Sequence, residues 1–189
     1  MRRVISALVL TAVAAVAGST PRPAPALTIN IPNGSPVQLS QFKGKVTVVE
    51  FLLTTCPHCQ NAAQMMSRLQ NEYGPKGFQS LGVAFNDMAQ MLVPDFVRDY
   101  KVNYPVGHTT REVVYSFLQN DPKMSLHVPQ IVIIDRNGVI RHQSLPREDT
   151  VTATEKFLRE NIERLLKEPA ARVRKAPAAA KKAAAKAAS

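Results

Sequence analysis

Two cysteines, Cys56 and Cys59, are the residues best suited to covalent chemistry, and they stand three positions apart. A disulfide between residues this close closes a very short loop and removes little chain entropy, so the pair is a poor structural staple. Three positions along a helix bring the second sulfur to the same face, within reach of the first. The second thiol can then resolve a mixed disulfide formed by the first. We therefore interpret the pair as a redox dithiol.

The segments around the cysteines indicate a strand followed directly by a helix. Residues 45–53 form a β-branched, apolar run that is typical of a buried central strand, and apolar residues recur at helical spacing over 62–73. Cys56 then falls at the helix N-terminus, where unpaired backbone N–H groups favour the negative charge of a thiolate. Pro57 suits the first helical turn. His58 adds a hydrogen-bond donor or a positive charge, which favours the thiolate and an oxidising potential.

The remaining pattern predicts an α/β fold. Strands are expected at 78–85 and 129–135, and a hairpin turn at Asn137-Gly138 leads into a partner strand at 139–143. A short edge strand is expected at 27–31. Helices are expected at 87–100, after a capping box at 109–112, and at 154–167. In the first of these, Met91, Leu92, Phe96 and Val97 are expected to face the core, with Pro94 early in the helix or splitting it. Early strand–helix alternation implies a parallel central sheet, and the hairpin adds an antiparallel edge.

The N-terminus has the pattern of an export signal. Arg2 and Arg3 precede an uncharged apolar run at 4–17, and Ala15-Val16-Ala17 fits a cleavage site before Gly18. The run is shorter than the roughly 20 residues that span a membrane. We therefore predict a signal peptide at 1–17, with an uncleaved membrane anchor as the alternative, and a periplasmic or secreted protein.

The net charge of +10 belongs to the ends of the chain. Nine of the 24 basic residues lie in the first 26 positions or after position 168, whereas all 14 acidic residues lie within 27–168, which is close to neutral. The predicted organisation is a proline-rich extended linker at 18–36, a folded domain at 37–168, and a disordered basic tail of Ala, Lys, Arg and Pro at 169–189.

The motif Cys56-Pro57-His58-Cys59 after a strand resembles the thioredoxin superfamily, in particular its exported TlpA/ResA-like branch, and the same CPHC dipeptide choice is that of the DsbA family. The resemblance covers about 36–167. It implies a thioredoxin-like fold with a central mixed sheet flanked by helices. The 70 positions from Cys59 to Pro129 match the strand–helix insertion of the TlpA-like pattern, because 78–85 has the pattern of a strand.

The resemblance also implies roles for residues outside the motif. Glu50, six positions before Cys56, matches a buried carboxylate that relays a proton to or from Cys59. Apolar neighbours favour its burial, which raises a carboxyl pKa toward the range useful for proton transfer. Val128 and Pro129 match the segment with a cis proline that docks the substrate chain.

The sequence departs from the family pattern in two ways. Thr55 stands where the family often has Trp, and the chain has no Trp, so the surface formed with Pro57 beside Cys56 is less aromatic. Pro57-His58 also differs from the dipeptides of many reductive TlpA-like proteins, which leaves the direction of electron flow open.

Other functions remain as alternatives. A zinc site needs a second ligand pair that the sequence does not offer, and copper delivery lacks a clear third ligand. A peroxiredoxin-like peroxidase expects Pro and Thr or Ser where Val49 and Leu53 stand. A redox-inert binding module could be held on an anionic surface by the basic tail. Peroxide consumption and tail deletion separate these alternatives.

The sequence thus predicts an exported thiol–disulfide oxidoreductase. Its catalytic residues are Cys56, Cys59, His58 and Glu50, and its substrate-binding residues are Val128, Pro129, Pro57 and Thr55. No cofactor or metal is expected. The expected partners are protein thiols or disulfides and a redox protein that recycles the pair, with a weak anionic-surface contact through the tail, and the protein is expected to be a monomer.

Overall fold

The computed structural model describes residues 18–146 and 153–169. The predicted signal peptide and nearly all of the basic tail lie outside these residues. The elements in chain order are β1 (Arg22–Pro23), β2 (Thr28–Ile29), β3 (Val37–Gln38), η1 (Leu39–Phe42), β4 (Val46–Leu52), α1 (Pro57–Tyr73), η2 (Gly74–Lys76), β5 (Phe78–Ala84), α2 (Ala89–Asp99), β6 (Val106–His108), α3 (Arg111–Leu118), β7 (Gln130–Ile134), β8 (Val139–Gln143) and α4 (Glu155–Lys167).

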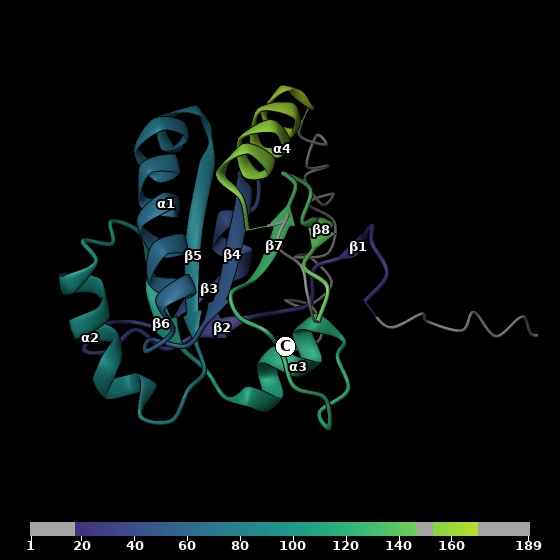
Figure 1. The fold of residues 1–189 in the computed structure, drawn as a ribbon. Coiled ribbons are helices and arrows are strands. Elements are labelled where there is room, and N and C mark those ends of the chain that lie inside the picture. Colours follow the sequence, from purple (N-terminus) through teal and green to yellow (C-terminus); the bar gives the residue numbers. More distant parts are fainter. Residues whose placement is uncertain (1–17, 147–152, 170–189) are drawn as a thin grey trace, which may run out of the picture.

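A mixed six-stranded sheet forms the centre of the molecule, in the order β1-β8-β7-β4-β5-β6 (Figure 1). β4, β5 and β6 run parallel, whereas β7 pairs with β4 and with β8 in antiparallel fashion. The predicted central strand is confirmed, because β4 is flanked on both sides and all seven of its residues are buried. β2 and β3 form a separate antiparallel pair.

Alternate side chains of β4 supply the two hydrophobic cores on either side of the sheet. Val46, Val48 and Leu52 pack in one core with residues of α1, α2 and α4. Val49 and Phe51 pack in the other core with residues of α3 and of the β2–β3 region. This two-residue period places Glu50 on the same face as Val48 and Leu52, against α1.

The hairpin between β7 and β8 forms at the predicted turn. Gly138 has a φ of +80°, a conformation that suits glycine, and its N–H donates to the Asp135 carbonyl at 3.0 Å. The Asp135 carboxylate also accepts from the backbone N–H groups of Asn137 and Val139. The turn therefore helps to set the register in which β8 pairs with β7.

α2 differs from its prediction in phase. Ala89, Val93 and Phe96 are its buried residues, and Met91 is 67% exposed, so the expectation that Met91 faces the core was wrong. Phe96 confirms the expected face. Pro94 lies inside the helix without splitting it.

Residues 18–36, expected to form a linker, instead pack against the domain in the structure. Arg22 pairs across from Ile140 of β8, and its guanidinium donates to the Phe117 carbonyl and to Gln143. Leu27 and Ile29 are buried in the core that contains α3. No helix in the described residues is long and apolar enough to cross a membrane.

Candidate redox site

Cys56 lies at the N-terminus of α1, as predicted. It is the N-cap residue with extended backbone, Pro57 begins the helix, and the Cys56 side chain is half-buried. The Cys56 carbonyl accepts from the Gln60 N–H at 3.0 Å, which is the first helical hydrogen bond. The free N–H groups of this turn favour negative charge on a nearby sulfur. The structure therefore places the outer sulfur at the start of α1.

The turn before Cys56 is held by side-chain hydrogen bonds from the loop after β5 and from α1. The Thr54 N–H donates to Asn86 Oδ1 at 2.9 Å, and Asn86 Nδ2 donates to Thr54 Oγ1 at 3.1 Å. Gln60 Nε2 donates to the Thr54 carbonyl at 3.1 Å. Thr54 is buried. These contacts fix the end of β4 relative to the first turn of α1.

Replacing Asn86 with Ala should destabilise this turn. The Thr54 N–H then lies in a buried position without its acceptor, at a cost of about 1–2 kcal/mol in the free energy of unfolding. Asn86→Asp keeps an acceptor for that N–H and serves as the matched control, with a smaller loss. Urea unfolding of both variants measures the difference. Equal losses in the two variants would show that the contact to the Thr54 N–H does not hold the turn.

Val128 and Pro129 meet the cysteine motif across 72 positions of sequence. The Val128–Pro129 bond is cis, which confirms the geometry expected from the resemblance. Cys56 Sγ lies 3.9 Å from the Val128 carbonyl oxygen, within the range of a thiol hydrogen bond. Val128 and Pro129 are both half-buried, so their backbone groups beside the sulfur remain accessible to a docking chain.

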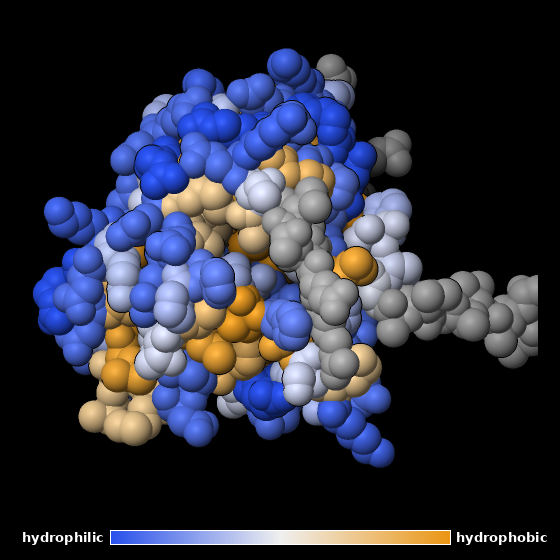
Figure 2. Space-filling model, in the orientation of Figure 1, coloured by the Kyte–Doolittle hydropathy of each residue, from blue (hydrophilic) through white to orange (hydrophobic). Residues whose placement is uncertain are grey.

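A groove of about 560 Å³ runs along α1 beside this contact. Its lining residues come from α1, from the segment around the cis proline and from the segment that precedes α4: His58, Asn61, Ala62, Met65, Arg68, His127, Val128, Pro129, Gln130 and Ala153. Figure 2 shows the face with α1 in front, where apolar side chains gather in a central hollow bordered by hydrophilic surface. The groove is open, and one of its lining residues, Val128, has the carbonyl that lies next to Cys56 Sγ.

The other predicted docking residues lie at the surface. Thr55 and Pro57 are exposed on either side of Cys56. Neither lines the groove, whereas His58 does. The structure therefore brings Val128, Pro129 and His58 together at the groove. Thr55 and Pro57 lie outside the groove, on the surface next to Cys56.

Cys59 and Glu50 lie behind Cys56 in the protein interior. Both residues have no exposed surface, which confirms the predicted burial of Glu50. Burial raises the pKa of the Cys59 thiol, and the nearby Glu50 carboxylate raises it further. Burial also raises the pKa of the Glu50 carboxyl well above its usual value. The two groups thus favour sharing a proton over both being ionised.

Tyr104 is a site residue that sequence reasoning missed. It lies in the loop between α2 and β6, is 6% exposed, and belongs to the same core as Cys59. Neither Glu50 carboxylate oxygen has a hydrogen-bond partner of regular geometry among the described residues. Burial raises the pKa of the Glu50 carboxyl, and Tyr104 lowers it in part. The Tyr104 hydroxyl lies 3.5 Å from the Ala63 carbonyl of α1. No motif marks Tyr104, because its distance from Cys59 in the sequence is set by the insertion.

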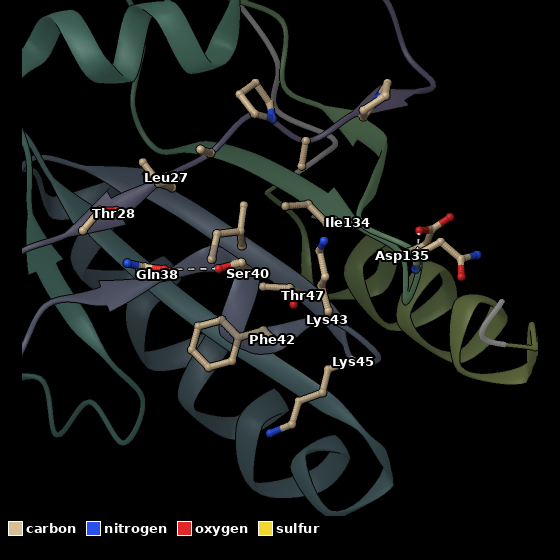
Figure 3. Close-up of a pocket in the computed structure, with 17 residues that line it drawn as sticks. Leu27, Thr28, Gln38, Ser40, Phe42, Lys43, Lys45, Thr47, Ile134 and Asp135 are labelled. Atoms are coloured by element: carbon tan, nitrogen blue, oxygen red, sulfur yellow. Dashed lines mark hydrogen bonds between the residues drawn. The ribbon is translucent and has the colours of Figure 1, made fainter. Parts of the chain in front are cut away.

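A second hollow, of about 380 Å³, lies at the other end of β4 (Figure 3). Its lining includes the apolar residues Leu27, Phe42 and Ile134 and the basic residues Lys43 and Lys45. β4 begins here at Val46 and ends at Leu52 next to the cysteine turn. This hollow is therefore separate from the sulfurs. In 18–146 and 153–169, no three side chains of His, Cys, Asp or Glu come together as metal ligands.

Comparison with known proteins identifies relatives that carry out thiol chemistry. The profile of the AhpC/TSA family matches residues 21–143. "Thiol-disulfide oxidoreductase ResA" of Oceanobacillus iheyensis is 30% identical over 106 residues, which is 56% of this chain and 52% of that protein. The ResA protein of Bacillus thuringiensis is 25% identical over 138 residues, 72% of this chain and 75% of that protein. The chain thus spans about half the length of the first relative and three quarters of the second.

A solved structure shows the same fold. The thiol:disulfide interchange protein of Chlorobium tepidum, a thioredoxin family protein, superposes with a TM-score of 0.64 at 23% identity, over 78% of this chain and 98% of that one. The predicted thioredoxin-like fold is confirmed. The predicted enzyme class is confirmed at the level of the family, since relatives are thiol–disulfide oxidoreductases and this chain has the two neighbouring cysteines. Because the family profile covers well over half of its length, this chain belongs to the AhpC/TSA family of the thioredoxin superfamily.

Proposed function

We propose that this chain is an exported thiol–disulfide oxidoreductase that exchanges disulfides with protein substrates through Cys56 and Cys59. One observation carries the proposal. Cys56 is half-buried at a helix N-terminus, 3.9 Å from the Val128 carbonyl that precedes a cis proline, and Cys59 is buried behind it. This arrangement supports an outer sulfur that attacks and an inner sulfur that resolves.

In the first step, the Cys56 thiolate attacks one sulfur of a substrate disulfide. A bond forms between Cys56 and that sulfur, the substrate disulfide breaks, and the leaving substrate thiolate takes a proton from solvent. The substrate backbone lies in the groove, where Val128 and Pro129 present their backbone beside the sulfur. His58, at the same groove, favours the negative charge on Cys56 and so tunes the potential of the pair.

In the second step, the Cys59 thiol gives its proton to the Glu50 carboxylate. The resulting Cys59 thiolate attacks Cys56 Sγ, an intramolecular disulfide forms, and the second substrate sulfur leaves as a thiolate that is then protonated. The substrate gains two electrons and the cysteine pair loses two. The reverse sequence oxidises a substrate dithiol. A separate redox protein must return the pair to its starting state.

The location and the ends of the chain complete the proposal. Residues 1–17 direct export to the periplasm or beyond, the domain acts as a monomer, and the basic tail adds a weak contact with an anionic surface. These parts rest on the sequence alone.

Turnover of insulin disulfides by dithiothreitol tests the proposed activity. The purified domain should accelerate the precipitation of the insulin B chain, and the tail-deleted form should keep this activity. Peroxide consumption by the same preparation is the second arm, because it separates exchange from the peroxidase alternative. Rapid peroxide consumption with no effect on insulin would overturn the proposal in favour of that alternative.

A further inference from the structure

Tyr104 and Glu50 are two buried polar groups that each lack a good partner. The Tyr104 hydroxyl lies 3.5 Å from the Ala63 carbonyl, which is long for a hydrogen bond from a hydroxyl. That carbonyl already accepts from Ser67 Oγ at 2.9 Å. Glu50 has two acceptor oxygens without a regular donor in the described part of the chain. A buried donor and a buried acceptor in this state are each costly, so the structure favours their pairing.

The loop that contains Tyr104 is fixed to the helix that carries the cysteines. Asn103 Nδ2 donates to the Ser67 carbonyl at 3.2 Å and to Asn71 Oδ1 at 2.6 Å, both on α1. On the other side of Tyr104, the Pro105 carbonyl accepts from the Gly82 N–H at 3.0 Å. Gly82 pairs with Glu50 in the sheet. Tyr104 is therefore held between α1 and β5, the strand that pairs with Glu50.

We propose that Tyr104 is a positioning residue, whose hydroxyl donates a hydrogen bond to the ionised Glu50 carboxylate and so sets the pH at which Glu50 accepts the Cys59 proton. The inference rests on the proposed function, because it concerns the second step of the exchange. The bond stabilises the carboxylate and is weaker with the neutral acid. Without it, a carboxyl with no exposed surface holds its proton to a higher pH and is unable to act as the base.

Among the described residues that surround Glu50, Tyr104 is the group suited to donate a hydrogen bond to its carboxylate. The titratable groups that act on Glu50 or respond to it are Cys56 and Cys59 of α1 and Tyr104. The sulfurs bring negative charge or no charge, so they oppose ionisation of Glu50. The strands and helix that complete this core contribute apolar side chains: Ala84 of β5, Ile131 and Ile133 of β7, and Leu158 and Ile162 of α4.

The test follows the two sulfurs separately with 5,5′-dithiobis(2-nitrobenzoic acid) in a stopped-flow spectrometer. Attack by Cys56 releases one coloured thiolate, and attack by Cys59 on the mixed disulfide releases the second. The leaving group is a good one, so loss of the Cys59 proton limits the second release. In Tyr104→Phe, the pH midpoint of the second phase should rise by about one unit. Its rate should fall about tenfold below the wild-type midpoint and match wild type at high pH.

Three controls separate this role from a structural one. Tyr115→Phe removes the hydroxyl of another buried tyrosine, which lies in the opposite core and donates to the Met124 carbonyl. This variant should leave both phases unchanged. In a Glu50→Gln background, Tyr104→Phe should produce no further shift. Site-specific 3-fluorotyrosine at position 104 keeps the ring and strengthens the donor, so the midpoint should move to lower pH. This last variant also covers the case in which Tyr104→Phe does not fold.

The outcomes distinguish the inference from the function on which it rests. The wild-type protein is compared with both variants. If it shows a second phase, and the pH midpoint of that phase is the same in Tyr104→Phe and in the fluorinated protein, that result overturns the role of Tyr104 alone. A midpoint shift that persists in the Glu50→Gln background would do the same. Absence of any second phase in the wild-type protein would instead contradict the proposed resolving role of Cys59.

Discussion

Cys59→Ser should accumulate stable mixed disulfides with substrate proteins, while Cys56→Ser should exchange no faster than the uncatalysed background. The difference follows from burial. Cys56 is half-buried at the helix N-terminus, whereas Cys59 has no exposed surface and a thiol whose pKa is raised by that burial. The outer sulfur can therefore reach a substrate, and the inner one can reach only a disulfide already formed at Cys56.

Mass spectrometry after non-reducing electrophoresis measures this result. Each single-serine variant is incubated with oxidised insulin and quenched with acid, and covalent adducts are quantified. The double variant Cys56→Ser/Cys59→Ser controls for non-covalent association. Adducts of equal yield in the two single variants would contradict the assignment of an attacking and a resolving sulfur.

Glu50→Gln should change both the pH dependence of stability and the rate of the resolving step. The folded-state pKa of Glu50 is raised well above its usual value, so the native state keeps a proton that the unfolded state releases. Its contribution to stability is therefore complete below the unfolded pKa of about 4.3 and is lost as pH rises toward the folded pKa. Within that window the free energy of unfolding should fall by up to about 1.4 kcal/mol per pH unit.

Urea unfolding of reduced protein at a series of pH values from about 4.5 to 8 measures this slope. Glu50→Gln should remove the Glu50 part of the slope while other groups titrate as before, so the difference between the two curves isolates one carboxyl. The same variant should slow the second phase of thiol release, because Cys59 loses its base. Parallel stability curves for wild type and Glu50→Gln would show that the Glu50 pKa is not raised in the folded protein.

Much of the site could be predicted because it depends on local sequence. The apolar strand that ends before Cys56 and the proline after it place the sulfur at a helix N-terminus, and the structure confirms both. The two-residue period of β4 also decides the burial of Glu50, since Val48 and Leu52 on the same face lie in a core. The cis geometry of Pro129 followed from the resemblance and not from any local pattern.

The features that were missed depend on partners far away in the sequence. Arg22 lies in a segment whose prolines indicate extended chain, and an extended chain becomes a strand only where another strand accepts it, here at Ile140. In α2, both Met91 and Val93 have a helical spacing to other apolar residues, so the sequence does not decide which of them faces the core. Packing against the rest of the domain buries Val93 and leaves Met91 exposed. Tyr104 became a neighbour of Glu50 through the fold of the insertion, and no spacing rule relates the two positions.

Equilibration of the wild-type domain in glutathione buffers of graded potential tests the dithiol account most directly. After acid quenching, intact mass should show one transition between a dithiol form and a form lighter by two hydrogens, fitted by a two-electron curve, with little glutathione adduct. The midpoint would also give the direction of electron flow. Glutathione adducts on Cys56 with no internal disulfide at any potential would show that the two sulfurs do not act as a pair.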